Sequence, residues 1–156
     1  MLAKRVPVCH RPQMSRPEPW RLDQSAYPYT VVVPTRWADL DTLGHINNVS
    51  MAGLFEEGRG RFSQSLGLHR KLPGERWLVA SVIVNYVAEA HHPHDIMIAS
   101  GVRHVGTRSW TIVSGAFQNG KCVATCDTTF VYTNDTGAIP FPDAFAEKFA
   151  TVRVGG

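Results

Sequence analysis

The apolar positions of residues 48–66 recur every three or four residues, whereas those later in the chain alternate or run together. The recurring positions, one glycine included, are Met51, Leu54, Phe55, Gly58, Phe62 and Leu66. This spacing predicts an α-helix with one apolar side. Asn48 is a suitable N-cap because its side-chain oxygen can accept from the free N–H groups of the first turn. Gly67 followed by Leu68 predicts a left-handed C-cap.

Gly53, Gly58 and Gly60 all lie inside this predicted helix. Each costs a helix about 1 kcal/mol relative to alanine. Such a cost is reasonable if a large element, such as a sheet curled around the helix, must approach it closely. Glu56 and Arg59 lie three residues apart and can pair on one side of the helix, either at the surface or buried.

Strand patterns flank the predicted helix on both sides. Residues 30–37 are rich in β-branched side chains, and Pro34 favours an edge position or a bulge. Residues 78–87 form a continuous apolar run, which predicts a strand buried on much of both faces. Asn119-Gly120 is a strong hairpin signal, and residues 142–150 fit a short terminal helix. Further strands are expected at residues 96–105, 109–118 and 121–133.

One helix followed by a run of four strands predicts an α+β protein with an antiparallel sheet. The 156 residues suffice for one domain with a substantial core, which we place at residues 28–150. Residues 1–27 are rich in proline and arginine without periodicity, so we expect a flexible leader there, and residues 151–156 form a C-terminal tail. No apolar run approaches the roughly 20 residues of a membrane span. A cytoplasmic location without membrane association is expected.

The formal net charge of +3 at pH 7 is mild. It suits an anionic small ligand, but the scattered basic residues do not form the clustered face that nucleic acids require. Cys122 and Cys126 lie four apart in a predicted strand and therefore on one face. Two small buried side chains are expected there rather than a disulfide or a metal site.

Polar reactive groups concentrate between the first strand and the helix. Asp41 is followed by Gly44, which permits tight chain reversal, and the start of the helix presents free N–H groups with a partial positive charge. Such donors stabilise a carbonyl oxygen as it gains negative charge in acyl transfer. A carboxylate nearby can attack the carbonyl carbon or activate a water. An aspartate before a helix is also a common cap or turn residue, and the residues alone leave that alternative open.

The neighbouring polar residues are assigned more modest roles. Asp39 alternates with Leu40 and is expected to be structural, while His45 is either a general base or a hydrogen-bonding turn residue. The spacing of Asp39, Asp41 and His45 resembles no metal-ligand set, so no metal is expected. Residues 91–95, His-His-Pro-His-Asp, are expected to form a solvated loop rather than a metal site.

These residues resemble the 4-hydroxybenzoyl-CoA thioesterase-like branch of the hotdog-fold superfamily. Its pattern runs Arg-aromatic-x-Asp-x-Asp-x-x-Gly-His-hydrophobic-Asn-Asn, followed by a helix that ends in Glu-x-x-Arg. The matching residues are Arg36-Trp37, Asp39, Asp41, Gly44 to Asn48, and Glu56 with Arg59. The resemblance continues through residues 84–88 and 106–112 and covers roughly residues 29–142.

The resemblance implies a hotdog fold, in which an antiparallel sheet of about five strands wraps around one central helix. It implies a homodimer or homotetramer with sites at the subunit interface. The implied activity is hydrolysis of an acyl-CoA thioester to a carboxylic acid and free coenzyme A, without a metal or redox cofactor. A non-catalytic acyl-thioester binding protein is the alternative on the same fold. A hotdog-type enoyl-CoA hydratase ranks last, because its differently spaced Asp and His segment is not found here.

The resemblance also implies roles for individual residues. Asp41 matches the catalytic nucleophile or general base, and Asn48 matches the helix-start position whose backbone N–H contributes to the oxyanion site. His45 and Asn47 would hold the loop or a water, and Asn47 would help to bind the substrate. Glu56 and Arg59 would support the structure.

A second region is implied to contact coenzyme A. Thr107, Arg108 and Ser109 match a segment that meets its pantetheine or phosphates, where Arg108 is either a phosphate ligand or a solvated hairpin residue. The chain departs from the family pattern at three positions. Glu89 and His91 stand where relatives usually carry proline and an apolar residue, and Met51 stands where tyrosine is frequent. These departures leave the substrate open.

Overall fold

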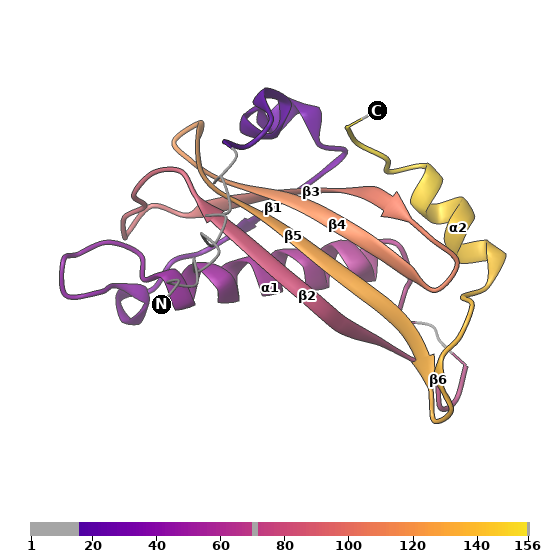
Figure 1. Ribbon diagram of the computed structural model, residues 1–156. Helices are drawn as coiled ribbons and strands as arrows, with labels where there is room; N and C mark the ends of the chain where they lie inside the picture. The colour runs from indigo at the N-terminus through magenta and orange to yellow at the C-terminus, as the bar shows by residue number, and fades with distance from the viewer. Residues whose placement is uncertain (1–15, 70–71, 156) are drawn as a thin grey trace, which may run out of the picture.

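The computed structural model describes residues 16–69 and 72–155, which form one antiparallel sheet curled around a long helix (Figure 1). The long strands are β1 (Tyr29–Val33), β2 (Arg76–Tyr86), β3 (Ile96–Val105), β4 (Ser109–Gln118) and β5 (Lys121–Asn134), and the short β6 (Gly137–Ala138) pairs with β5. The strand order β1-β3-β4-β5-β2 leaves β1 and β2 at the two edges. The expected α+β class and hotdog fold are confirmed.

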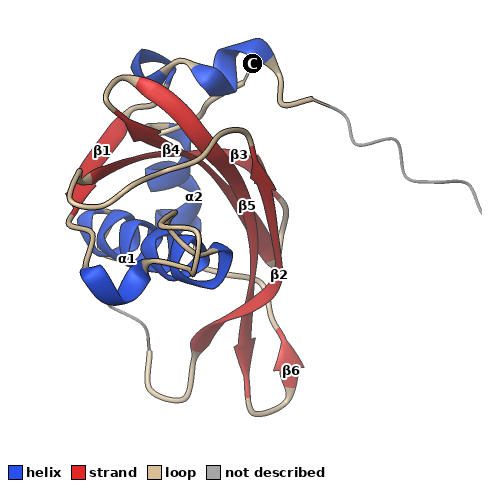
Figure 2. Ribbon diagram, turned by 90° about the vertical axis from the view of Figure 1, so that its left-hand side faces the viewer, coloured by secondary structure: helices blue, strands red, loops and turns tan. Residues whose placement is uncertain are grey.

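The helix α1 (Asn48–Ser65) lies in the hollow of the sheet (Figure 2). Its buried positions are Met51, Leu54, Phe55, Gly58 and Phe62, as the spacing predicted, whereas Leu66, the last predicted position, is the C-cap and is half-buried. Gly67 has a φ of 69° and donates its N–H to the carbonyl of Gln64, while Leu68 donates to the carbonyl of Ser63. This pair of bonds is a Schellman motif, so the predicted left-handed C-cap is confirmed. No helix in residues 16–69 and 72–155 is both long and apolar enough to cross a membrane.

The N-cap of α1 is Asn47, and the assignment to Asn48 was wrong by one residue. The side-chain oxygen of Asn47 accepts from the N–H of Val49 at 2.8 Å. The N–H of Asn47 donates to the carbonyl of Asp39 at 2.7 Å, which ties Asn47 back to the loop. Asn47 has a ψ of 145°, outside the helical region, so the helix begins with Asn48.

Close approach of the sheet to α1 occurs at only one of the three helical glycines. A β-carbon on Gly58 would lie 2.4 Å from Cγ2 of Ile98, a residue of β3. For Gly53 and Gly60, no heavy atom of the described residues lies within 4 Å of the β-carbon position, apart from their chain neighbours and the backbone of α1 itself. The explanation from close packing therefore holds for Gly58 and is wrong for the other two.

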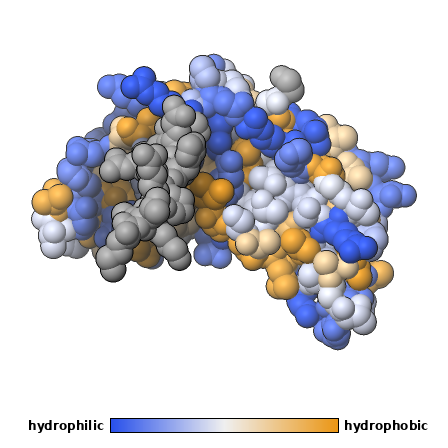
Figure 3. All heavy atoms as spheres, in the orientation of Figure 1, coloured by the Kyte–Doolittle hydropathy of each residue, from blue (hydrophilic) through white to orange (hydrophobic). Residues whose placement is uncertain are grey.

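Strand β2 is exposed over most of its length, which contradicts the prediction that it is buried on both faces. Among the strands described, it pairs with β5 alone. Its apolar side chains Leu78, Val79, Val82, Ile83 and Tyr86 are 43–55% exposed. Orange, hydrophobic spheres lie along the course of β2 in Figure 3. The apolar run is real, but nothing within the described part of the protomer covers it.

Part of the face of the sheet opposite α1 is covered by the chain before β1 (Figure 1). Two 3-10 turns, η1 (Pro19–Leu22) and η2 (Gln24–Ala26), cross this face. Arg21 is 5% exposed and forms an ion pair with Asp127 of β5. Tyr27 packs into a cluster with Phe117 and Val154. The segment from Pro19 to Tyr27, expected in the flexible leader, is thus packed on the domain. Residues 1–15 of that leader lie outside the described residues.

The C-terminal part of the chain closes the core beside β3 and β4. The predicted terminal helix is confirmed as α2 (Asp143–Ala150), whose Phe149 stacks on Trp110 at 4.2 Å between ring centroids. After α2, Arg153 forms a parallel bridge with Val102. The expected tail of residues 151–156 is therefore attached to the sheet at Arg153.

Cys122 and Cys126 are both free, and they lie on different faces of the sheet rather than on one. The register of β4 and β5 shifts between Ala116 and Phe117, and the shift leaves Val123 as an extra residue in β5. This bulge reverses the alternation of the strand. Cys126 packs with the cluster around α1, whereas Cys122 packs with the cluster on the opposite face.

Candidate active site

A cavity of about 680 Å³ opens at the N-terminal end of α1. One side is formed by the loop before α1 and its first turns, and the other by the segment that leaves β2. The lining residues are Asp41, His45, Ile46, Asn48, Met51, Tyr86, Val87, Ala88, Glu89 and Ala90. Three of the residues singled out from the sequence, Asp41, His45 and Asn48, thus line one space.

Asp41 organises the loop that carries it. Its Oδ1 accepts the N–H of Leu43 at 2.8 Å and the N–H of His45 at 3.1 Å. Gly44, with a φ of 81°, completes the turn by donating its N–H to the carbonyl of Asp41. These hydrogen bonds, first that from His45, hold the pKa of Asp41 below its ordinary value. The side chain is therefore an ionised carboxylate at neutral pH, and it also has the turn role that the sequence left open.

Asp39 is buried and structural, as its position predicted. Its side chain is 2% exposed and lies 2.8 Å from the guanidinium of Arg36. Its Oδ2 also accepts the backbone N–H of Arg36 at 2.8 Å. The hydrogen bond from the Arg36 side chain is the main reason that the pKa of Asp39 lies below its ordinary value.

Asn47 and Asn48 have different roles at the start of α1. Asn47 uses its side-chain oxygen to cap Val49, so that oxygen is already occupied. Asn48 is the first helical residue, and its N–H has no partner within the helix. The Asn48 carbonyl accepts a hydrogen bond from the hydroxyl of Tyr86 at 3.0 Å. This contact joins the helix start to the end of β2 across the cavity.

Thr107, Arg108 and Ser109 lie at the other end of the sheet. Through the register of β4, β5 and β2, Ser109 lies level with Leu78, the third residue of β2. Tyr86, which lines the cavity, is eight positions further along that strand. At about 3.3 Å per residue, this separation is about 26 Å. A single protomer therefore does not bring this tripeptide to Asp41.

Glu56 and Arg59 do pair, with 3.6 Å between Oε1 of Glu56 and an Arg59 nitrogen. The pair is neither fully at the surface nor fully buried, since the Arg59 side chain is 12% exposed and the Glu56 side chain is 75% exposed. Arg59 lines a separate cavity of about 300 Å³ beside Trp77 and Trp110. The pair supports the helix and does not touch the cavity that contains Asp41.

Tyr86 and Glu89 are cavity residues that the sequence analysis did not identify as such. Tyr86 lies in a segment that the family resemblance covers, and this resemblance is the signal that indicates its place near the site. Glu89 and His91 were noted only as departures from the family pattern. In the expected solvated loop, His91, His94 and Asp95 are exposed, while His92 is bonded through Nδ1 to the hydroxyl of Thr35 at 3.0 Å.

A family model described as the thioesterase-like superfamily matches residues 35–149. This match extends from the residue before Arg36 to the penultimate residue of α2. It therefore includes the loop, the helix and all the strands after them. No curated protein matches the chain significantly.

Several solved structures share the fold over most of their length. The PA5185 protein of Pseudomonas aeruginosa superposes with a TM-score of 0.76 at 22% identity, covering 85% of this chain and 96% of its own. A protein of Bacillus stearothermophilus described as a predicted thioesterase gives 0.74 at 28% identity, with coverages of 82% and 98%. A thioesterase of Thermus thermophilus, complexed with coenzyme A and Zn, gives 0.72 at 24% identity, with coverages of 81% and 95%.

Proposed function

Because the chain belongs to the thioesterase-like superfamily, with thioester hydrolysis as its general activity, we propose that it hydrolyses acyl-CoA thioesters to a carboxylic acid and free coenzyme A. One observation carries the proposal: an ionised carboxylate, Asp41, and the first backbone N–H of a long helix, at Asn48, line the same cavity. The similar thioesterase that was crystallised with coenzyme A supports coenzyme A as the carrier.

In the proposed reaction, the thioester carbonyl oxygen lies at the start of α1. The N–H of Asn48 and the helix dipole stabilise the negative charge that develops on this oxygen. Asp41 accepts a proton from a water whose oxygen bonds to the carbonyl carbon. The carbon–sulfur bond then breaks, and the proton passes to the leaving sulfur. Direct attack by Asp41, through an anhydride that water later opens, gives the same products.

The other loop residues position this machinery. Asn47 fixes where α1 begins, and the N–H of His45 holds one oxygen of Asp41 in place. The second oxygen of Asp41 is the one proposed to meet water or substrate. These steps require no metal or redox cofactor.

We further propose a homodimer formed through the exposed edge of β2. An apolar edge strand with unpaired backbone groups is a template for pairing with a second chain. Antiparallel pairing of two copies about the middle of β2 places the start of one strand beside the end of the other. The start of the partner's β4, at Thr107-Arg108-Ser109, is then three strand spacings away, about 14 Å. The tripeptide would reach the cavity from the second copy, where Arg108 could bind a phosphate of coenzyme A.

The proposal is tested by thiol release from a panel of short, medium, long and aromatic acyl-CoAs. Each substrate is paired with its N-acetylcysteamine thioester, which keeps the acyl group and removes the nucleotide arm. We expect turnover of at least one acyl-CoA, with a higher KM for the matching truncated thioester. Binding of acyl-CoAs without any thiol release would instead establish the non-catalytic binding protein on this fold.

A further inference from the structure

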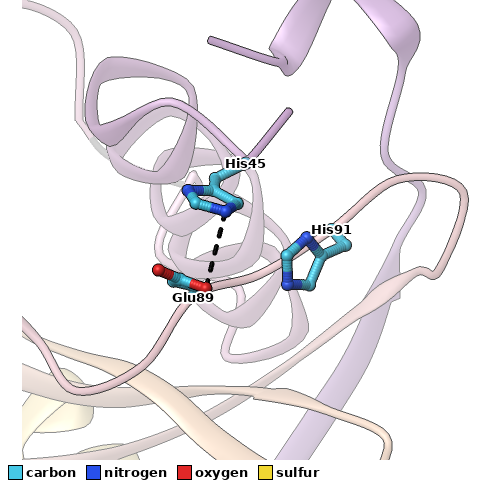
Figure 4. A group of neighbouring side chains, drawn as sticks. All are labelled: His45, Glu89 and His91. Atoms are coloured by element: carbon cyan, nitrogen blue, oxygen red, sulfur yellow. Dashed lines mark ion pairs between the residues drawn. The ribbon is translucent and has the colours of Figure 1, made fainter. Parts of the chain in front are cut away.

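Three side chains with metal-ligating atoms, those of His45, Glu89 and His91, lie close together (Figure 4). The first two line the cavity, and the proposed hydrolysis gives none of the three side chains a catalytic role. His45 comes from the loop before α1, and Glu89 and His91 come from the segment after β2. One ligand atom from each lies within 4.8 Å of the other two. Nε2 of His45 is 3.5 Å from Oε2 of Glu89, and the imidazole rings of His45 and His91 are 5.1 Å apart between centroids.

The backbones that carry these side chains are fixed to one another. The N–H of Ile46, next to His45, donates to the carbonyl of Ala90 at 2.7 Å. Both backbone groups of His91 are hydrogen-bonded to the side chain of Gln118. The Gln118 side chain accepts from the His91 N–H at 2.9 Å and donates to the His91 carbonyl at 2.7 Å. Gln118 is itself buried, 6% exposed. The loop of His45 is thus bonded to Ala90, which lies between Glu89 and His91, and the backbone of His91 is itself fixed. Fixed backbones of this kind favour an efficient metal site.

We propose that His45, Glu89 and His91 form a binding site for one divalent transition-metal ion of the Zn²⁺ type. Two imidazole nitrogens and one carboxylate favour Zn²⁺ over Mg²⁺ or Ca²⁺, which select all-oxygen sites. Ligands at about 2.1 Å around a tetrahedral ion lie about 3.4 Å from one another. The distance between His45 and Glu89 already meets this requirement. Glu89 and His91 are exposed, and the site requires a rotamer change that brings His91 to the same spacing.

Three protein ligands leave one tetrahedral position for water or another ligand. His45 and Glu89 also line the cavity that contains Asp41. An ion held by them is therefore adjacent to the space assigned to the thioester, an assignment that rests on the proposed function. The site itself does not depend on that function, because binding of an ion requires only the three side chains.

Spacing along the sequence does not reveal this set, since His45 and Glu89 are far apart in the chain. The histidine run at residues 91–94 was expected to be solvated, and only its first member joins the cluster. His92 bonds to Thr35, and His94 lies outside the cluster. His94 therefore provides a matched control, an exposed histidine of the same loop.

The test is direct titration of the full-length protein, stripped with a chelator, with ZnCl₂ by isothermal calorimetry. Co²⁺ is titrated in parallel, and its visible absorption reports tetrahedral coordination. We expect one equivalent to bind to the wild type. Glu89→Gln and His91→Ala should each weaken binding by at least about tenfold, and His94→Ala should bind as the wild type does. Circular dichroism verifies that each variant is folded.

Absence of binding to the wild type, or equal affinity in all four proteins, would overturn the site. The result is independent of hydrolysis. Zn²⁺ binding that depends on Glu89 and His91 supports the site even in a protein that releases no thiol. Conversely, turnover by a protein that binds no metal would retain the proposed function and remove this inference.

Discussion

Asp39 and Asp41 are two residues apart, and their carboxylates lie in different surroundings. The Asp39 side chain is 2% exposed and is held by the guanidinium and backbone N–H of Arg36. Asp41 lines the cavity, and its partners among the described residues are backbone N–H groups of its own turn. Hydrogen bonds to the charged form lower the pKa of both groups. One carboxylate therefore stabilises the loop, and the other is available to a substrate.

Replacing Asp39 with asparagine should destabilise the fold in a pH-dependent way. The folded pKa of Asp39 is depressed, so its ionised form stabilises the protein above the ordinary Asp pKa of about 3.9, and this stabilisation is lost as pH falls through the folded pKa. Because Asp39→Asn removes charge-assisted hydrogen bonds, we expect it to lower the free energy of unfolding by about 2 kcal/mol at pH 7. Urea unfolding at a series of pH values should show this loss shrinking below about pH 4. Asp95→Asn, at an exposed position, is the control, and a loss that stays constant with pH would contradict the assignment.

The sequence was most informative where a residue acts through its own neighbours. Asp41, Gly44 and His45 form a local turn whose hydrogen bonds span at most four positions, so spacing alone indicated it. The contribution of Glu89 to the cavity depends on how β2 pairs with β5 and where it ends beside α1. The position of Glu89 beside α1 is set by contacts between residues far apart in the sequence, so no local sequence pattern indicates it. Asn47 and Asn48 were confused for a related reason: both are good caps, and the contact from Asn47 to Asp39 decides between them.

At the scale of elements, the close contact between α1 and β3 depends on Gly58, which has no side chain. Gly58 lets Ile98 approach the helix backbone, and a β-carbon at this position would lie 2.4 Å from Cγ2 and 2.8 Å from Cβ of Ile98. The Cβ of Ile98 cannot move without its strand. The helix and the sheet would therefore have to separate to admit even a methyl group.

Alanine substitutions at two helical glycines should consequently have opposite effects. Gly58→Ala gains about 1 kcal/mol of helix propensity but overpacks the core at a cost of up to about 3 kcal/mol, so we expect a net loss of about 2 kcal/mol. Gly53→Ala meets open space and should stabilise the protein by about 1 kcal/mol. Chemical denaturation measures both. Equal or greater stability of Gly58→Ala would show that the sheet does not depend on this close contact.

Periodicity predicts which segments are helices and strands, but it does not predict which elements lie next to one another. The helix α1, the strands and the hairpin at Asn119-Gly120 follow from local patterns and turn chemistry. The bulge at Val123 does not, because an extra residue is visible only in the register between two strands. The apolar run of β2 correctly indicated a strand but wrongly indicated one buried on much of both faces. A strand covered by a second chain has the same composition as one covered by its own sheet.

At the scale of the whole molecule, the proposed dimer accounts for both the exposed edge of β2 and the distant Thr107-Arg108-Ser109 tripeptide. Pairing of two copies through β2 would cover the first and bring the second toward the cavity. The proposed dimer thus links assembly to substrate binding. Turnover of acyl-CoA should depend on assembly more strongly than turnover of a truncated thioester.

A charge on this edge should separate the subunits. Ile83 is 55% exposed, and Ile83→Lys places an ammonium group where the second copy would pair, which is an arrangement that edge strands use to prevent association. We expect a wild-type dimer and a monomeric variant in light scattering coupled to size exclusion. Val32→Lys, on the other edge strand β1, is the control and should remain dimeric. A monomeric wild type, or an unchanged mass for Ile83→Lys, would contradict the interface.

The most direct test of the central claim is kcat for Asp41→Asn on the best acyl-CoA substrate. Asparagine keeps an oxygen that can accept from Leu43 and His45, so the turn is retained while the carboxylate is lost. We expect kcat to fall by about 10² to 10⁴ while the protein stays folded with an unchanged oligomeric mass, and Asp95→Asn to match the wild type. A folded Asp41→Asn protein with wild-type kcat would show that the carboxylate of Asp41 does not carry the reaction.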